Sequence, residues 1–112
     1  MKRYLAFLIL LIVCYAQTSG ENALDICWET EYRVKKIVMC ESGGRHSGVW
    51  GDLDKPYPAY GIAQFQKRTF NWMKKLAGRP ELEWKNKEDQ LWLLRFAIKN
   101  NLQHHWTCAK EK

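Results

Sequence analysis

Glu41 is the residue of this chain best placed to do chemistry, because the sequence puts a carboxyl group at the end of an amphipathic helix. Between Glu29 and Glu41 apolar residues recur at helical spacing, Glu41 continues their stripe, and the glycines at positions 43 and 44 end the helix. A carboxylate there faces the negative end of the helix dipole, and apolar neighbours also disfavour its charge, so we expect its pKa to be raised. A carboxylic acid that stays protonated near neutral pH can donate a proton to a glycosidic oxygen. Most glutamates at the end of a helix are simply solvated, so only the surrounding residues can indicate whether Glu41 is catalytic.

The segments around Glu41 are mainly helical, with one loop-rich stretch. Residues 42–59 contain four glycines and two prolines and predict a long loop. The apolar segment 60–65 predicts a short strand or a tight turn, and residues 69–77 predict a helix that stops at Gly78. Asn86, with Asp89 three residues later as in a capping box, starts a last helix that runs to about residue 100. We therefore predict a small, single-domain, mainly α fold with a loop-rich segment between its first two helices.

The N-terminus has the features of a secretory signal peptide, which we place at residues 1–16. Two basic residues precede an apolar run at residues 5–13, which is too short to span a bilayer comfortably, and small and polar residues follow up to Gly20. Cleavage after Ala16 fits best, with Cys14 at the minus-three position, and cleavage as late as residue 20 is the alternative. Lipidation of Cys14 is disfavoured by the bulky Val13 before it. We expect the remaining domain, residues 21–112, to be secreted to the extracellular space or to the cell envelope or periplasm.

The charge of the chain is basic but does not select a partner. The formal net charge is +6, and loss of Lys2 and Arg3 with the leader leaves 16 basic against 12 acidic residues, a net charge of +4. Such a protein is attracted to anionic cell-wall polymers, membranes and nucleic acid alike.

Three cysteines remain after the predicted cleavage, at positions 27, 40 and 108, so one thiol is left over. A bond between Cys40 and Cys108 would close a long loop and stabilise the fold by about 4 kcal/mol in the chain-entropy model. Pairing of Cys27 with Cys40 would constrain the chain much less. A zinc site that adds His104 or His105 is disfavoured, because no paired cysteine spacing supports it, and we expect neither a metal nor a cofactor.

Four short segments together resemble a known family. They are CESGG at residues 40–44, AYGIAQF at 59–65, TF at 69–70 and WTC at 106–108. The combination is similar to the lysozyme-like domains of resuscitation-promoting factors and soluble lytic transglycosylases, over about residues 37–108. The resemblance implies a disulfide-stapled, lysozyme-like α+β fold with Cys40 paired to Cys108. It also implies a secreted enzyme that cleaves the MurNAc-GlcNAc β-1,4 bond of peptidoglycan.

The same resemblance implies roles for individual residues. Glu41 matches the catalytic acid/base, and Ser42 beside it is expected to hydrogen-bond near the carboxylate and help to hold it. Tyr60, Gly61 and Gln64 match the segment that lines the floor of the cleft, where the amide of Gln64 would bind an N-acetyl or hydroxyl group of a sugar.

Two features depart from the family's pattern. The loop after Glu41 is longer than in compact resuscitation-promoting factors, and the Ala-Tyr-Asn motif of many soluble transglycosylases is absent. The loop carries Asp52 and Asp54, and either could supply a second carboxylate for lysozyme-type hydrolysis. The favoured interpretation is that both are turn-forming residues. Trp50, in the same loop, could stack on a sugar ring.

With one carboxylate, the simplest expected reaction is that of a lytic transglycosylase. Glu41 protonates the oxygen between the two sugars and then takes the proton of the muramoyl C6 hydroxyl, which closes on C1 to give a 1,6-anhydro end. The alternatives are hydrolysis with a second carboxylate, a non-catalytic cell-wall-binding module and, ranked last, a membrane-disrupting basic peptide. The expected partner is the peptidoglycan glycan strand. We expect a monomer that neither binds nucleic acid nor inserts stably into a membrane.

The remaining aromatic residues and histidines are assigned to packing or to the surface. Trp72, Trp92 and Trp106 occupy positions typical of core residues. His46 is interpreted as a lone exposed histidine, and His104 and His105 as surface or packing residues.

Overall fold

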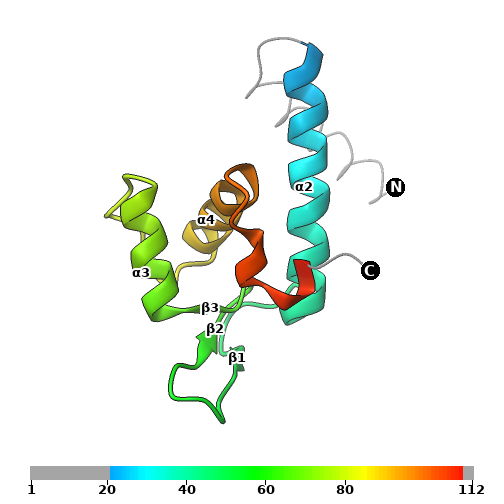
Figure 1. Cartoon of the computed structure of the whole chain (residues 1–112). Coiled ribbons are helices and arrows are strands. Elements are labelled where there is room, and N and C mark those ends of the chain that lie inside the picture. Colours follow the sequence, from blue (N-terminus) through cyan, green and yellow to red (C-terminus); the bar gives the residue numbers. More distant parts are fainter. Residues whose placement is uncertain (1–20, 110–112) are drawn as a thin grey trace. The chain divides into compact units, whose positions relative to one another are not determined.

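The computed structural model describes residues 21–109, with side chains from Cys27 onward (Figure 1). Internal contacts divide the chain into two units, Met1–Tyr32 and Arg33–Lys112. Among the described residues, the first unit contains only the N-terminal half of helix α2, and the second contains all the other elements. The predicted signal peptide at residues 1–16 and the alternative cleavage site at residue 20 lie outside the described residues. Within residues 21–109, no helix combines the length and the apolar character that crossing a membrane requires.

Helix α2, Glu21–Ser42, carries Glu41 on its last turn. The helix begins earlier than the predicted start at Glu29, because the preceding residues include good helix formers such as alanine and leucine. It ends as predicted. Gly43 adopts a φ of +67°, and its N–H donates to the carbonyl of Met39 at 3.2 Å.

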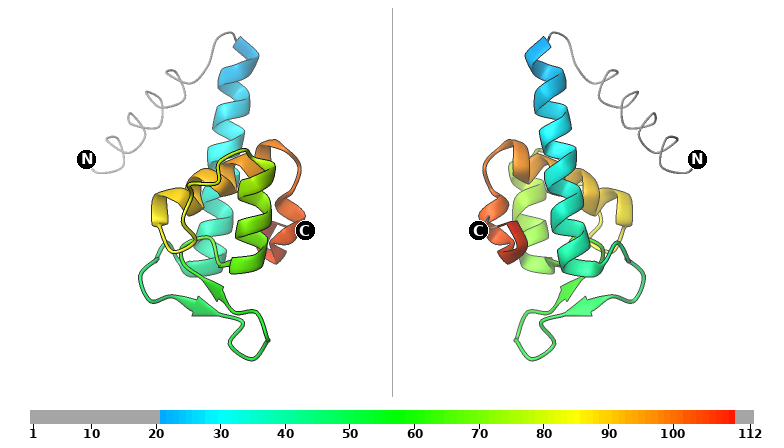
Figure 2. Two further views of the ribbon diagram at one scale, coloured as in Figure 1. Left: turned by 90° about the vertical axis from the view of Figure 1, so that its left-hand side faces the viewer. Right: turned by 90° about the vertical axis from the view of Figure 1, so that its right-hand side faces the viewer.

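A small antiparallel sheet with the strand order β1-β2-β3 follows α2. Its strands are β1 (Trp50–Gly51), β2 (Ala59–Tyr60) and β3 (Phe65–Gln66). In register, Trp50 lies opposite Tyr60, and Tyr60 lies opposite Phe65. The segment 60–65 is therefore a turn between two strand ends, and the predicted loop 42–59 contains β1 and the first residue of β2. The strands stay short because glycine and proline, which disfavour strands, surround them. Figure 2 shows the sheet at the end of the helices where α2 terminates.

Helices α3 (Lys67–Leu76) and α4 (Lys87–Lys99) lie close to their predicted positions. The Asn86 side chain accepts a hydrogen bond from the Asp89 N–H at 3.0 Å, which confirms the predicted N-cap. Such a cap stabilises a helix by about 1 kcal/mol. Asp89 does not complete a capping box, because its carboxylate accepts from the Glu83 N–H at 2.9 Å.

Two short 3-10 helices, η1 (Gln103–His105) and η2 (Thr107–Ala109), lead from α4 to the end of α2. A disulfide joins Cys40 to Cys108 across 68 residues of sequence, with a Cα–Cα distance of 5.9 Å. The pairing that the resemblance implied is thus confirmed. The alternatives, a bond from Cys27 to Cys40 and a zinc site, are wrong because the sulfur atoms of Cys40 and Cys108 are already bonded to each other. In the full chain Cys27 is not free either.

Apolar side chains from α2, the 60–65 turn, α3, α4 and the C-terminal segment form the core of residues 33–109. The buried members are Val34, Ile37, Val38, Ile62, Ala63, Phe65, Phe70, Met73, Leu82, Leu93, Leu94, Ala97, Ile98 and Trp106. The Phe65 ring is central, with its centroid 5.3 Å from that of Phe70 and 5.0 Å from that of Trp106, both edge to face. The described residues thus contain three α-helices, a three-stranded sheet and one disulfide around a single core.

The three tryptophans assigned to the core differ in their surroundings. Trp106 is buried as predicted, and Trp92 is half-buried and stacks on Phe96 at a centroid distance of 6.0 Å. The prediction for Trp72 is wrong, because its side chain is 48% exposed. Phe70 and Met73 occupy the buried face of α3, and Trp72 lies on the other face.

Candidate active site

Glu41 lines an open pocket built from the end of α2, the sheet region, the start of α3 and the C-terminal segment. The lining residues are Glu41, Asp52, Gln64, Phe65, Gln66, Thr69, His105, Trp106 and Thr107. The cavity volume is about 160 Å³, below the roughly 300 to 1,000 Å³ of pockets that enclose a whole ligand. The pocket therefore suits one group of a larger molecule, the rest of which would lie on the surface.

Three effects act on the Glu41 carboxyl group, and together they raise its pKa above 4.5. Partial burial is the largest effect and raises the pKa, because it disfavours the charged form. A hydrogen bond from the Cys108 backbone N–H lowers the pKa, and the negative charge of Asp52 raises it. The predicted raised pKa of Glu41 is confirmed, with burial as its main cause.

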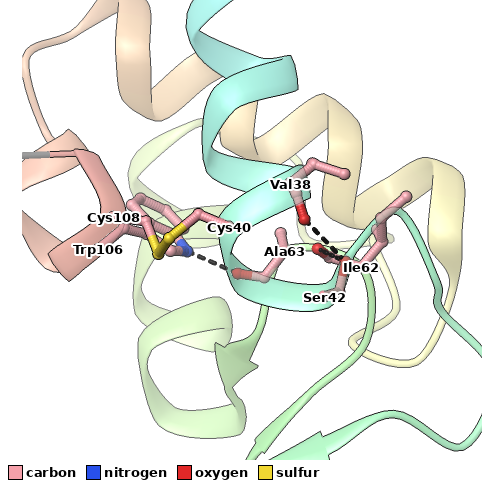
Figure 3. The surroundings of a disulfide bond; sticks show 7 residues. All are labelled: Val38, Cys40, Ser42, Ile62, Ala63, Trp106 and Cys108. Atoms are coloured by element: carbon pink, nitrogen blue, oxygen red, sulfur yellow. Dashed lines mark hydrogen bonds between the residues drawn. A yellow bond between two sulfur atoms is a disulfide. The ribbon is translucent and has the colours of Figure 1, made fainter.

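The Cys40–Cys108 disulfide, which Figure 3 shows, positions one wall of this pocket. Cys40 precedes Glu41 in the chain, and Cys108 directly follows Trp106 and Thr107, so the bond holds these two lining residues beside the carboxyl group. Trp106 is also fixed from within, because its Nε1–H donates to the Ala63 carbonyl at 2.6 Å. One covalent bond thus stabilises the fold and shapes the site.

Ser42 does not hold the Glu41 carboxylate and does not face a ligand, contrary to its predicted role. Its side chain is 4% exposed, and its hydroxyl oxygen lies 2.7 Å from the Ile62 carbonyl and 3.1 Å from the Val38 carbonyl (Figure 3). A buried hydroxyl needs protein acceptors, and these two satisfy it. Ser42 therefore joins the last turn of α2 to the 60–65 turn and so positions the end of the helix that carries Glu41.

Gly61, predicted on the floor of the cleft, is buried as well and does not line the pocket of Glu41. Its φ is +90°, and a Cβ atom here would lie 2.6 Å from Gln90 Nε2 and 2.7 Å from His46 Cε1. Glycine is needed because two side chains pack directly against this backbone position.

Tyr60 faces an aromatic cluster instead of the Glu41 pocket. Its hydroxyl accepts from the Gly48 N–H at 3.1 Å, and its ring centroid lies 4.7 Å from that of Trp50 and 5.9 Å from that of Trp84. Lys85 Nζ lies 5.3 Å from the Trp50 ring centroid, within cation–π range. Neither Tyr60 nor Trp50 lines the pocket, so the structure does not bring these two predicted sugar contacts to Glu41.

Gln64 lines the pocket as predicted, but its amide nitrogen is already used. The Nε2 hydrogens donate to the Val49 carbonyl at 3.0 Å and to the Gly61 carbonyl at 2.9 Å. The side chain also lies against Gly51, where a Cβ atom would be 2.0 Å from Gln64 Oε1. A ligand can therefore meet only the oxygen of this amide, as a hydrogen-bond donor.

Of the two aspartates in the loop, only Asp52 lies beside Glu41. Asp52 adopts a left-handed φ of +53°, is exposed, and forms an ion pair with Lys55 Nζ at 3.4 Å. Asp54 is exposed and does not line the pocket. The structure therefore leaves one candidate for a second carboxylate.

The sequence did not single out Gln90, which holds the 60–65 turn in place. The side chain is fully buried, and its Oε1 accepts from the Ala63 N–H at 3.0 Å. Its Nε2 donates to the carbonyls of Tyr60 and Trp84, at 2.8 and 2.7 Å. All the hydrogen-bonding groups of this amide are directed at backbone atoms, so Gln90 replaces the backbone partners that the turn lacks.

His46 is not the lone exposed histidine that the sequence suggested. Its Nδ1 accepts from the Ile62 N–H at 3.0 Å, and its Nε2 lies 2.8 Å from the Lys85 carbonyl oxygen. This pair of contacts requires the tautomer with its hydrogen on Nε2. His46 thus joins the loop after α2 to the 60–65 turn and to the segment before α4.

His105 and Thr107 belong to the site although the sequence placed neither of them there. Burial lowers the pKa of His105, and the positive charge of neighbouring His104 lowers it further. The signal that could have located both residues was their position beside Cys108 in the sequence, because the expected disulfide to Cys40 brings that segment to Glu41.

Asp52→Asn is expected to lower the pKa of Glu41, because the substitution removes one of the two effects that raise it. A carbon-13 NMR titration of the Glu41 carboxyl group measures the shift. Asp54→Asn, which neutralises a loop aspartate outside the pocket, is the matched control and should leave the titration unchanged. An equal response in the two variants would contradict the contact between Asp52 and Glu41.

The pocket can perform acid–base chemistry on a polar group that enters it. It offers a half-buried carboxylic acid, an exposed carboxylate, an amide oxygen and the side chains of Thr69 and Thr107. Among the residues described, no cluster of three or more His, Cys, Asp or Glu side chains is arranged to hold a metal ion. No family model matches this chain, and no curated protein or solved structure matches it either.

Proposed function

We propose that this chain is a secreted enzyme that cleaves the MurNAc-GlcNAc β-1,4 bond of peptidoglycan, with Glu41 as its acid/base. The observation that carries the proposal is the half-buried Glu41 carboxyl group, whose pKa is raised and which lines an open pocket. A carboxyl group of this kind retains its proton to higher pH than an exposed one, as a general acid at a glycosidic oxygen must.

The reaction needs one protein carboxyl group if the strand supplies the nucleophile. Glu41 donates its proton to the bridging oxygen as the C1–O bond breaks, and positive charge develops on C1 and the ring oxygen. The carboxylate then accepts the proton of the muramoyl C6 hydroxyl while that oxygen bonds to C1. The products are a 1,6-anhydro end and a free 4-hydroxyl end, and Glu41 is protonated again.

Hydrolysis is the second candidate reaction, because Asp52 lines the same pocket as Glu41. An Asp52 carboxylate could activate water or stabilise the charge on C1. Transglycosylation remains our first choice, because Asp52 is exposed and already forms an ion pair with Lys55.

The choice of substrate rests on the resemblance of residues 37–108 to lytic transglycosylase domains, and the lysozyme-like relationship is part of the proposal. The signal-peptide features of residues 1–16 support secretion. The Cys40–Cys108 disulfide is typical of proteins in oxidising compartments and supports it as well.

Mass spectrometry of the soluble products from purified insoluble peptidoglycan tests the proposal. We expect muropeptides with 1,6-anhydro ends from both the wild-type protein and Asp52→Asn. If the wild-type protein instead releases muropeptides with reducing ends and Asp52→Asn does not, the reaction is hydrolysis. Absence of any soluble product from a folded, disulfide-bonded protein would exclude both reactions.

A further inference from the structure

A second groove lies on the surface of α3. Its lining residues are Tyr57, Lys67, Arg68, Asn71, Trp72 and Lys75. The helical members are spaced by three or four residues and therefore share one face of α3. The groove has a volume of about 560 Å³, within the roughly 300 to 1,000 Å³ of ligand sites. Nothing in the reaction at Glu41 uses these residues.

The groove combines exposed aromatic rings with unpaired positive charge. The side chains of Tyr57 and Trp72 are 49% and 48% exposed. The Arg68 guanidinium carbon lies 4.4 Å from the Tyr57 ring centroid, and a guanidinium stacked in this way keeps its in-plane N–H groups available for a carboxylate. Across residues 21–109, neither Arg68 nor the two lysines of the groove has an ion-pair partner. Helix α3 itself has no acidic residue.

The groove borders the pocket of Glu41. The Trp72 ring centroid lies 5.6 Å from that of His105, which lines the pocket. Thr69, on the same helix as Arg68 and Trp72, lines the pocket too. A chain molecule that enters the pocket can therefore continue along α3.

We propose that this groove binds an acidic stretch of the glycan strand whose scissile bond lies at Glu41, an inference that rests on the proposed function for the identity of the strand. The apolar faces of its sugar rings pack on Tyr57 and Trp72. The carboxylates of its peptide stems bind Lys67, Arg68 and Lys75. Single-stranded nucleic acid also matches aromatic rings among cations, but the shared border with the pocket favours the polymer on which the pocket acts.

Co-sedimentation with insoluble peptidoglycan, in a Glu41→Gln background that prevents turnover, tests the groove directly. The variant Lys67→Gln/Arg68→Gln/Lys75→Gln removes its cations. The control variant, Lys35→Gln/Lys87→Gln/Lys99→Gln, removes the same charge from exposed positions elsewhere. We expect the groove variant to bind about tenfold more weakly and the control to stay within about twofold of the parent. On peptidoglycan whose carboxyl groups have been amidated, the difference between the two variants should disappear.

Trp72→Ala separates stacking from charge. It should weaken binding to native and to amidated peptidoglycan alike, because an aromatic ring packs on sugars without needing carboxylates.

The inference is overturned if both triple variants bind native peptidoglycan equally. It is also overturned if the groove variant loses affinity for a single-stranded oligonucleotide but not for peptidoglycan. Binding that depends on the groove, together with no product from the wild-type protein, would instead refute the proposed reaction and leave the groove as a wall-binding site.

Discussion

Glu41→Gln is expected to lower the rate of glycan cleavage by about 10²- to 10⁴-fold, the usual effect of losing a general acid or base. Glutamine has nearly the same shape as glutamic acid but cannot deliver an acidic proton to the bridging oxygen or take one from the C6 hydroxyl. The initial rate of muropeptide release measures the effect. Binding to insoluble peptidoglycan should be retained, because the substitution removes no cation and no aromatic ring. Activity within about twofold of the wild type would exclude Glu41 as the catalytic acid.

The raised pKa of Glu41 also predicts how activity depends on pH. Cleavage requires the protonated carboxyl group, so the rate should fall as the pH rises through the pKa of Glu41. In Asp52→Asn this decline should begin at lower pH, because the Glu41 pKa is then lower.

The same pKa shift predicts a difference in stability between Glu41→Gln and the wild type. Measuring this difference also shows whether the variant is folded. Because the pKa of Glu41 in the folded protein lies above its ordinary 4.5, protonated Glu41 favours folding relative to the ionised form. This contribution is fully present below pH 4.5 and is lost as the pH rises through the folded-state pKa. Glu41→Gln should therefore unfold at higher urea concentration than the wild type at neutral pH and show less advantage in acid. Glu83→Gln, at an exposed position, controls for the loss of one negative charge.

Gln90→Leu is expected to lower the free energy of unfolding by about 5 kcal/mol, because one buried and two partly buried backbone groups lose their partner and each such loss costs about 1–3 kcal/mol. These groups are the Ala63 N–H and the carbonyls of Tyr60 and Trp84. Leucine is close to glutamine in size, so the packing around the site changes little. Since small domains are stable by only about 5–15 kcal/mol, this one substitution should remove about a third or more of the stability of the protein.

Urea unfolding followed by circular dichroism measures this effect, and the chain offers a matched control. Gln103 Oε1 is buried with no hydrogen-bond partner among the described residues. Gln103→Leu, the same chemical change, should therefore have little effect or stabilise slightly. Gln90→Glu should destabilise as Gln90→Leu does, because a carboxylate oxygen would face two carbonyl oxygens. If the two leucine variants were equally stable, the role assigned to Gln90 would be wrong.

The helices were predictable because they depend on local patterns. The stripe ending at Glu41, the glycine after Ser42 and the N-cap at Asn86 each act within a few residues of sequence, and the structure contains all of them. The sheet was harder to predict, because its strands are two residues long and are held by contacts with distant side chains. Trp72 was misplaced because an apolar residue type does not reveal which face of a short helix is covered.

The site was predictable only in part. Glu41 and Gln64 line the pocket, and of the two candidate second carboxylates Asp52 does so and Asp54 does not. Ser42, Gly61 and Tyr60 lie close to these residues in the sequence but face the interior or an aromatic cluster. Adjacent residues on a helix end or in a turn point in different directions, so nearness in sequence does not ensure a shared surface.

The sequence by itself determined the helices and a carboxyl group at the end of α2, because both follow from local propensity and periodicity. Only the tertiary structure decided the surroundings of that carboxyl group. The Cys40–Cys108 bond brings the C-terminal segment to Glu41, and Gln90 and His46 hold the 60–65 turn beside it. The raised pKa of Glu41 results mainly from this burial. Burial depends on contacts between segments that are far apart in the chain, and no local sequence pattern describes those contacts.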